Sequence, residues 1–82
     1  MDLCLHLGEV TLAMELKVWR DGAADPLPQG LAQLDRYLDG LGLQSGWLVI
    51  FDRRKSAGPA ATRSRQELAH SPAGREITVL RA

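Results

Sequence analysis

The stretch DLCLHLGEVTLAMELKVW (residues 2–19) decides the fold, because apolar and polar side chains alternate on both sides of Gly8-Glu9. Strict alternation is typical of β-strands, and a two-residue loop with glycine first fits a type II′ hairpin turn. That turn sets the opposing pairs as Leu7 with Val10, His6 with Thr11, Leu5 with Leu12, Cys4 with Ala13, Leu3 with Met14 and Asp2 with Glu15. One face of the hairpin is then apolar throughout, and a slip of one residue would mix the two faces. The sequence therefore predicts both the hairpin and its register.

The rest of the chain predicts one helix, from a leucine stripe at helical spacing, and three more strands. In chain order the predictions are a loop over 21–29, a helix over roughly 30–41 ended by Gly40 and Gly42, a strand over 46–51, a mobile basic loop over 52–66, and an edge hairpin of strands 67–71 and 75–81. The strand over 46–51 is continuously apolar, which predicts cover on both of its faces. The expected order is β-β-α-β plus a C-terminal hairpin, an α/β fold with a mixed sheet flanked by a helix.

Length and composition limit the class of protein. A chain of 82 residues makes one domain, and no apolar run reaches the ~18–20 residues of a membrane span. We see no secretory signal. The single cysteine, Cys4, excludes an intrachain disulfide framework and a multi-cysteine zinc site, and it suits a reducing cytosol. We therefore expect a cytoplasmic protein that does not bind membranes.

The charge is unevenly spread along the chain. Residues 1–52 carry eight acidic and three basic side chains, a net charge of −5, whereas residues 53–82 carry seven basic and two acidic ones, a net charge of +5. Such asymmetry fits a nucleic-acid-facing segment beside a cation-binding one. It also fits a solvated loop with ordinary surface arginines, and charge alone favours this second interpretation.

Two acidic residues that face each other across the hairpin suggest a site for a divalent cation. The Cβ atoms of Asp2 and Glu15 would lie ~4.5–5.5 Å apart, where like charges are destabilising, and a divalent cation such as Mg²⁺ would relieve the repulsion. Lys17 lies ~7 Å further along on the same face, so the three side chains suit metal-assisted phosphodiester hydrolysis. For Glu15 and Lys17 alone, a solvated strand face with a weak ion pair is the alternative. Cys4 and His6 share the face of Asp2, but the three spread ~13–14 Å along the strand, too far for one zinc ion.

These residues also resemble a known signature. Asp2, twelve intervening residues and then Glu15-Leu16-Lys17 resemble the PD-(D/E)XK nuclease signature, and Gln33 to Tyr37 is similar to the Q-x-x-x-Y motif of its RecB-like branch. Three segments, Glu15–Arg20, Gly30–Leu38 and Gly46–Asp52, together resemble the PD-(D/E)XK domains appended to bacterial AAA-ATPase-like proteins. The resemblance implies a restriction-endonuclease-like fold with an αβββαβ core, of which this single domain, residues 1–82, lacks the first helix and the first strand.

The resemblance further implies residue roles in a metal-dependent nuclease. Mg²⁺ (or Mn²⁺) would be held by Asp2, Glu15 and the main-chain carbonyl of Leu16, while Lys17 would orient or activate the attacking water. Gln33 and Tyr37 would position the lysine or the substrate, although Tyr37 packing beside the core with Gln33 on the surface is an equally good interpretation. The nucleic acid, for which DNA is favoured, would be held by the basic stretch of Arg53, Arg54, Lys55, Arg63 and Arg65.

A second hypothesis belongs to a different class of function. The chain would be a non-catalytic remnant that serves as an interaction or oligomerisation module of an ATPase-linked system. Without the family's first strand, the strand at residues 2–7 would expose an edge that invites pairing. A homodimer, or docking to an ATPase-domain partner, is therefore predicted under both hypotheses.

Overall fold

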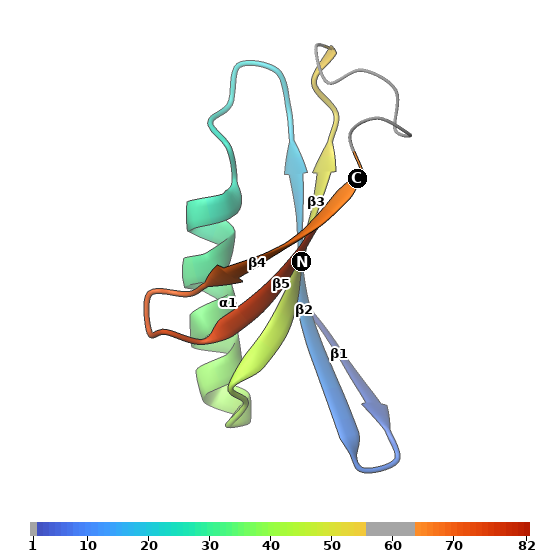
Figure 1. Cartoon of the computed structure of the whole chain (residues 1–82), viewed down its shortest axis with the longest axis vertical. Coiled ribbons are helices and arrows are strands. Elements are labelled where there is room, and N and C mark those ends of the chain that lie inside the picture. The colour runs from blue at the N-terminus through green and yellow to red at the C-terminus, as the bar shows by residue number, and fades with distance from the viewer. Residues whose placement is uncertain (1, 56–63) are drawn as a thin grey trace.

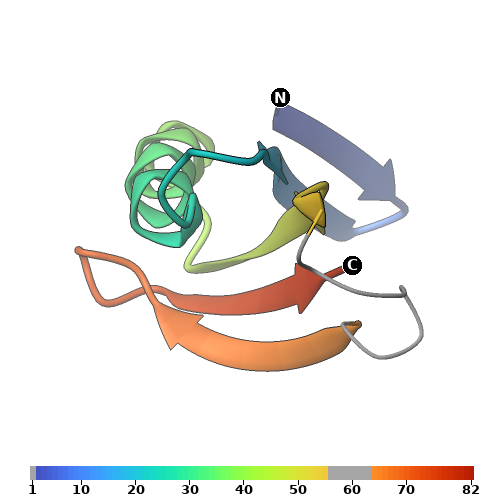
Figure 2. The ribbon, with the colours of Figure 1, turned by 90° about the horizontal axis from the view of Figure 1, so that it is seen from above.

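The computed structural model describes residues 2–55 and 64–82, which form a mixed five-stranded sheet with one helix on one face (Figures 1 and 2). The elements are β1 (Asp2–Leu7), β2 (Val10–Trp19), α1 (Leu27–Leu41), β3 (Ser45–Asp52), β4 (Arg65–His70) and β5 (Glu76–Arg81). The strand order is β1-β2-β3-β5-β4, in which β2, β3 and β5 run parallel and the two outer strands run antiparallel to their neighbours. The α/β class and the element order predicted from the sequence are confirmed. The predicted mobile loop falls mainly on residues 56–63, which lie outside the described residues.

The β1–β2 hairpin has the register that the turn predicted. Its Cα partners run from Leu7 with Val10 at the turn to Asp2 with Glu15 at the open end. Gly8 has φ +62°, whereas Glu9 has no positive φ. A type I′ turn needs positive φ at both central residues, so the turn belongs to type II′.

Helix α1 begins at Leu27, three residues earlier than predicted. The prolines that we interpreted as loop residues stand at the helix start, with Pro26 at the N-cap and Pro28 in the first turn. Proline is tolerated there, because the first N–H groups have no partner within the helix. The prediction that Gly40 ends the helix is wrong, since Gly40 lies inside α1 and Gly42 adopts the left-handed cap with φ +71°.

The core lies between α1 and the sheet. Its fully buried side chains come from alternate positions of β2, β3 and β5 and from one face of the helix, namely Ala13, Leu34, Leu38, Leu48, Ile50, Ile77 and Val79. Gly46 allows the helix to approach closely, because an added Cβ would lie 3.1 Å from Cδ1 of Leu38 and 3.2 Å from the carbonyl oxygen of Ala13. The face of the sheet that carries Glu15 and Lys17 is therefore the face that α1 covers.

The C-terminal hairpin differs from the prediction in its bounds and in its place in the sheet, since its strands span Arg65–His70 and Glu76–Arg81 instead of 67–71 and 75–81. We expected both strands at the edge, but β5 lies inside the sheet between β3 and β4, and β4 forms the edge. Parallel pairing with β3 brings Ile77 and Val79 to zero exposure in the core. The alternation in the sequence identified the strand but contained no information on its neighbours.

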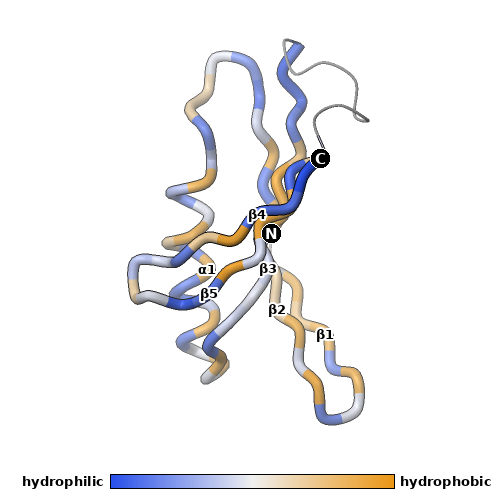
Figure 3. The backbone as a smooth tube through the Cα atoms, viewed as in Figure 1, coloured by the Kyte–Doolittle hydropathy of each residue, from blue (hydrophilic) through white to orange (hydrophobic). Residues whose placement is uncertain are grey.

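The other face of the sheet has no covering layer among residues 2–55 and 64–82. We call it the open face and define it by its apolar residues, Leu3, Leu5, Leu7, Val10, Leu12, Met14, Leu16, Val18, Trp47, Val49, Phe51, Leu68 and Leu80. The β1–β2 hairpin, which is hydrophobic over most of its length (Figure 3), projects beyond the body of the domain. The prediction that β3 is covered on both faces is therefore wrong for this part of the chain, in which α1 covers one face only.

The turn between β4 and β5 is fastened to the helix through Asp35. Arg75 places Nη1 3.0 Å from Oδ1 of Asp35 and donates from Nε to the carbonyl oxygen of Leu43 at 3.0 Å, and the N–H of Ala73 donates to Oδ2 of Asp35 at 2.8 Å. A hydrogen bond from the Ser71 side chain, together with those from Ala73 and Arg75, lowers the pKa of Asp35 below its ordinary value of 3.8, although desolvation acts in the opposite direction. The turn is thus held by charge-assisted hydrogen bonds to an ionised carboxylate.

Ser71 is 5% exposed, and its replacement by alanine is expected to lower the free energy of unfolding at pH 7. The loss is expected to be smaller at acidic pH. Because the folded-state pKa of Asp35 is depressed, the stability that its carboxylate contributes is complete above the unfolded pKa of 3.8 and is lost as the pH falls through the folded pKa. Urea unfolding of the wild type and Ser71→Ala between about pH 7 and pH 2.5 measures this. The exposed Ser45→Ala is the control, with little effect at either pH. An equal loss for Ser71→Ala at both ends of the range would contradict the assignment.

Candidate functional site

Glu15 is a buried carboxylate on β2, 2% exposed, on the face that α1 covers. Its backbone stands between Asp2 on β1 and Leu48 on β3. Burying an ionised carboxylate costs several kcal/mol unless it is paired. A carboxylate at this position therefore calls for an explanation other than packing.

Lys17 supplies the opposite charge. It lies two residues beyond Glu15 on the same face, and its Nζ is 3.5 Å from Oε1 of Glu15. The lysine side chain is 19% exposed, whereas that of the glutamate is 3% exposed. The lysine side chain thus reaches solvent in part, while the carboxylate with which it pairs is enclosed.

The remaining proposed metal ligands lie next to Glu15 along the backbone. Asp2 is its register partner across the hairpin, as the sequence predicted, and Leu16 follows it on β2 with a half-buried side chain on the open face. Residues 2–55 and 64–82 contain no group of three or more His, Cys, Asp or Glu side chains that could hold a metal ion. The donors predicted from the sequence are two acids and a backbone carbonyl. Such oxygen donors fit Mg²⁺, which often takes only one or two carboxylates from a protein.

The helix presents Gln33 and Tyr37 on the side of β2. Successive residues of an α-helix are rotated by about 100°. Gln33 and Tyr37 therefore lie on one flank of the buried leucine stripe that contains Leu34, and Asp35 lies on the other. Asp35 bonds to the turn between β4 and β5, and those strands lie on the opposite side of β3 from β2. Tyr37 packs against the core, and Gln33 is half-buried. Gln33 and Tyr37 therefore lie on the flank of α1 that is nearer to β2.

The predicted nucleic-acid ligands are not equivalent. Arg53 and Lys55 are exposed, and Arg65 has a side chain that is 63% exposed with its Nε 3.9 Å from Oε2 of Glu67. Arg63 lies outside the described residues. These placements keep three basic side chains accessible near the ends of β3 and β4.

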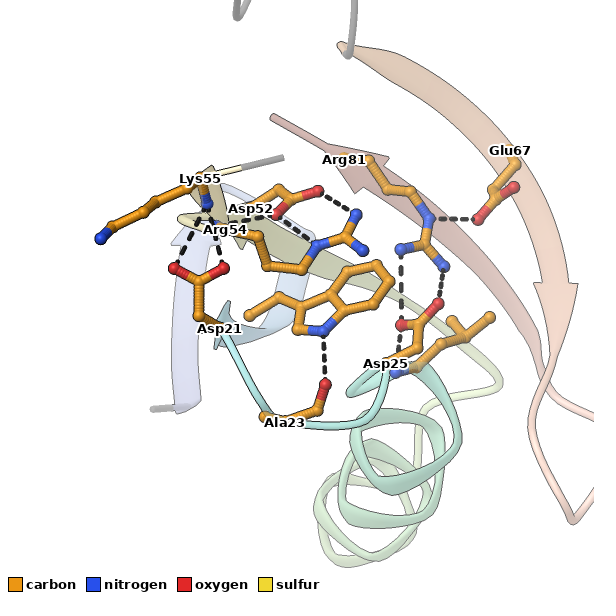
Figure 4. Close-up of polar contacts among 10 residues, drawn as sticks. Asp21, Ala23, Asp25, Asp52, Arg54, Lys55, Glu67 and Arg81 are labelled. Atoms are coloured by element: carbon orange, nitrogen blue, oxygen red, sulfur yellow. Dashed lines mark hydrogen bonds and ion pairs between the residues drawn. The ribbon is translucent and has the colours of Figure 1, made fainter. Parts of the chain in front are cut away.

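Arg54 is engaged within the protein. Its Nε and Nη2 donate to the two carboxylate oxygens of Asp52 at 2.9 and 2.7 Å, a bidentate pair that raises the pKa of Arg54. Its guanidinium carbon also lies 3.4 Å from the centroid of the Trp19 ring (Figure 4). The stacked, paired guanidinium is less suited to a phosphate than its exposed neighbours are.

A second arginine lies near the same ring. The guanidinium carbon of Arg81 is 5.8 Å from the Trp19 centroid, and the side chain bonds to Asp25 at 2.9 Å and to Glu67 at 2.9 Å (Figure 4). Trp19 Nε1 donates to the carbonyl oxygen of Ala23 at 3.0 Å. No local pattern in the sequence indicates this cluster, because only the sheet order brings the last strand next to the loop before the helix.

Cys4 and His6 take part in a side-chain contact within the hairpin. Sγ of Cys4 lies 3.5 Å from Nε2 of His6, and Oγ1 of Thr11 lies 3.2 Å from Nδ1 of the same ring. His6 is exposed and Cys4 is intermediate in exposure. The three side chains thus form a small contact network within the hairpin.

Comparison of the chain with protein-family models, with curated proteins and with solved structures gives no match. In the ranges 2–55 and 64–82, no helix has the length and the apolar character to cross a membrane.

Proposed function

We propose that the protein is a metal-dependent nuclease that hydrolyses phosphodiester bonds, with Asp2, Glu15 and Lys17 at its centre. The observation that carries the proposal is the enclosed Glu15 carboxylate, which lies 3.5 Å from the ammonium of a partly exposed lysine and whose residue pairs across the hairpin with a second acid. A buried ion pair contributes little to stability compared with apolar residues of similar volume. A functional requirement explains why these residues occupy the face that packs against α1.

The fold supports the same proposal. The order β1, β2, α1, β3 follows the restriction-endonuclease-like core from its second strand onward, as the resemblance implies. Gln33 and Tyr37 lie on the flank of α1 that is nearer to β2, which agrees with their expected positioning role.

In this proposal each residue has a defined task. Asp2, Glu15 and the carbonyl oxygen of Leu16 would hold Mg²⁺ or Mn²⁺. When bound, such a cation acts as a Lewis acid that neutralises charge on the phosphate and lowers the pKa of a coordinated water. Lys17 donates hydrogen bonds from its ammonium, which orients the attacking water and stabilises negative charge on the phosphate oxygens. Gln33 and Tyr37 position the lysine or the nucleic-acid backbone, and Arg53, Lys55 and Arg65 attract the strand electrostatically.

The test is cleavage of single-stranded and double-stranded DNA, and of RNA, during a titration with Mg²⁺ or Mn²⁺. The wild type is expected to cleave at least one substrate only when the metal is present. Glu15→Gln and Lys17→Arg, which keep the size or the charge of the side chain, are expected to reduce the rate by on the order of 10²–10⁴-fold. Far-UV circular dichroism of each variant verifies that it is folded.

Two exposed positions provide matched controls. Glu76→Gln removes an exposed carboxylate from β5 and Arg36→Lys exchanges an exposed cation on α1, and both should cleave like the wild type. Absence of cleavage by the wild type with either metal on all substrates would refute the proposal. Cleavage that persists unchanged in both site variants would identify a contaminating nuclease and refute it equally.

The alternative function, a non-catalytic interaction module of an ATPase-linked system, is favoured by a different observation. The open face leaves Leu5, Leu7 and Val10 47–63% exposed, which a catalytic role does not explain. A folded protein that never cleaves and that associates through this face would support the alternative.

A further inference from the structure

The open face is an unusually apolar surface for a domain of this size. Six of its side chains, Leu3, Leu5, Leu7, Val10, Val18 and Leu68, are 38–63% exposed. Together with the half-buried apolar residues between them, they extend across all five strands of the sheet, whereas the apolar side chains on an ordinary surface are scattered singly. Exposure of this extent marks an interaction surface.

The size of the surface matches one particular kind of partner. Each partner in a standard protein–protein interface contributes about 800 Å². Strands that lie ~4.8 Å apart and rise ~3.3 Å per residue give this five-stranded face a footprint of the same order. Two sheets that pack face to face do so at ~10 Å separation with their strands within about 30° of each other. A second open face, stacked in this way, therefore has sufficient area to cover the first.

The charge distribution favours a second copy of the chain over other partners. None of the residues that β1, β2 and β3 present on the open face is charged, and the acid Glu76 lies at the far corner, at the start of β5. When two identical surfaces meet around a two-fold axis, charged residues near the axis face like charges on the partner, which weakens the association. The centre of the open face carries no charged residues. The same lack of basic residues makes the face unsuitable for nucleic acid or anionic lipid, which Lys and Arg recognise.

We propose that the open face binds the open face of a second copy, which makes the protein a two-fold symmetric dimer with the two sheets stacked and the two helices on the outside. A two-fold contact is isologous, so each residue is used on both subunits. The proposal is independent of the nuclease activity, because Glu15 and Lys17 lie on the opposite face of the sheet.

The test is the molar mass of the full chain from about 1 to 200 µM, measured by light scattering after gel filtration and by sedimentation velocity. The wild type is expected at twice the chain mass of 9.0 kDa. Leu5→Lys and Val18→Lys, each of which places a charge on the exposed part of the open face, are expected to weaken the dimer at least 100-fold and to yield monomers. Circular dichroism of each variant verifies the fold, and Val18→Thr, which keeps strand propensity, is expected to weaken the dimer less.

The matched control is His6→Lys, which introduces the same charge on the same strand as Leu5 but on the opposite face. It should remain dimeric, and its thermal midpoint should rise with protein concentration as that of the wild type does. A folded wild type that stays monomeric at about 200 µM would overturn the proposal. A dimer that survives both Leu5→Lys and Val18→Lys would also overturn it and would indicate pairing through the free edge of β1.

Discussion

Leu38→Ala is expected to lower the free energy of unfolding by about 2–5 kcal/mol, the range for truncating a fully buried leucine. Leu38 is 0% exposed and packs at the point where α1 comes closest to Gly46 on β3. The helix has little room to move in and fill the space, because it already lies close to the sheet at Gly30, where an added Cβ would be 2.8 Å from Cδ1 of Leu48. Since small domains are stable by only about 5–15 kcal/mol, the loss should be visible as a large drop in the urea midpoint.

Leu41→Ala provides the matched control for this substitution. It makes the same chemical change on the same helix, but Leu41 is 40% exposed, so we expect a loss below about 1 kcal/mol. Both variants should be unfolded at the same protein concentration, because dimerisation would stabilise the folded state. Equal losses of unfolding free energy at the two positions would contradict the packing of α1 against the sheet through Leu38.

Lys17→Met is expected to destabilise the protein by roughly 3 kcal/mol, because it leaves the enclosed Glu15 carboxylate without the ammonium that offsets its burial. Glu15→Met should change stability by less than about 1 kcal/mol, since the 19% exposed lysine can still be hydrated. The asymmetry follows from the different burial of the two side chains.

The double variant Glu15→Met with Lys17→Met completes the cycle. Its stability is expected to return to the wild-type value or to exceed it, as is common when a buried ion pair is replaced by apolar residues. Denaturant unfolding of all four proteins measures the coupling. A double variant that is as unstable as Lys17→Met would show that the pair stabilises the fold, and this would weaken the argument that function retains it.

The local part of the fold could be predicted from the sequence. The Gly8-Glu9 turn and the period-2 alternation on either side of it are sufficient to set the hairpin register, because a one-residue slip would expose different faces. The pairing of Asp2 with Glu15 follows from that register. The helix was also predicted, although its start was not, because Pro26 and Pro28 are compatible with both a loop and a first helical turn.

The candidate site was predicted only along the strand. The spacing of Glu15 and Lys17 indicated that they share a face, but not that this face is covered by α1 and encloses the carboxylate. The position of Gln33 and Tyr37 relative to β2 likewise depends on the tertiary structure. Arg75 pairs with Asp35 on one flank of α1, and this leaves Gln33 and Tyr37 on the flank nearer to β2.

The meaning of the charge asymmetry was decided by the tertiary structure. Several basic residues of the second half pair with acids of the first half, as Arg75 does with Asp35 and Arg81 does with Asp25. The opposite net charges of the two segments thus partly cancel inside the molecule, which neither interpretation from the sequence anticipated.

By itself, the sequence determined the contacts between neighbours in the chain, because turn geometry and side-chain periodicity act over a few residues. Only the tertiary structure decided that β5 enters the sheet beside β3, that the helix covers the face of Glu15, and that the apolar face of the hairpin is left open among the described residues. These features depend on which distant segments bury their apolar surface against each other, and periodicity is the same whichever partner is chosen.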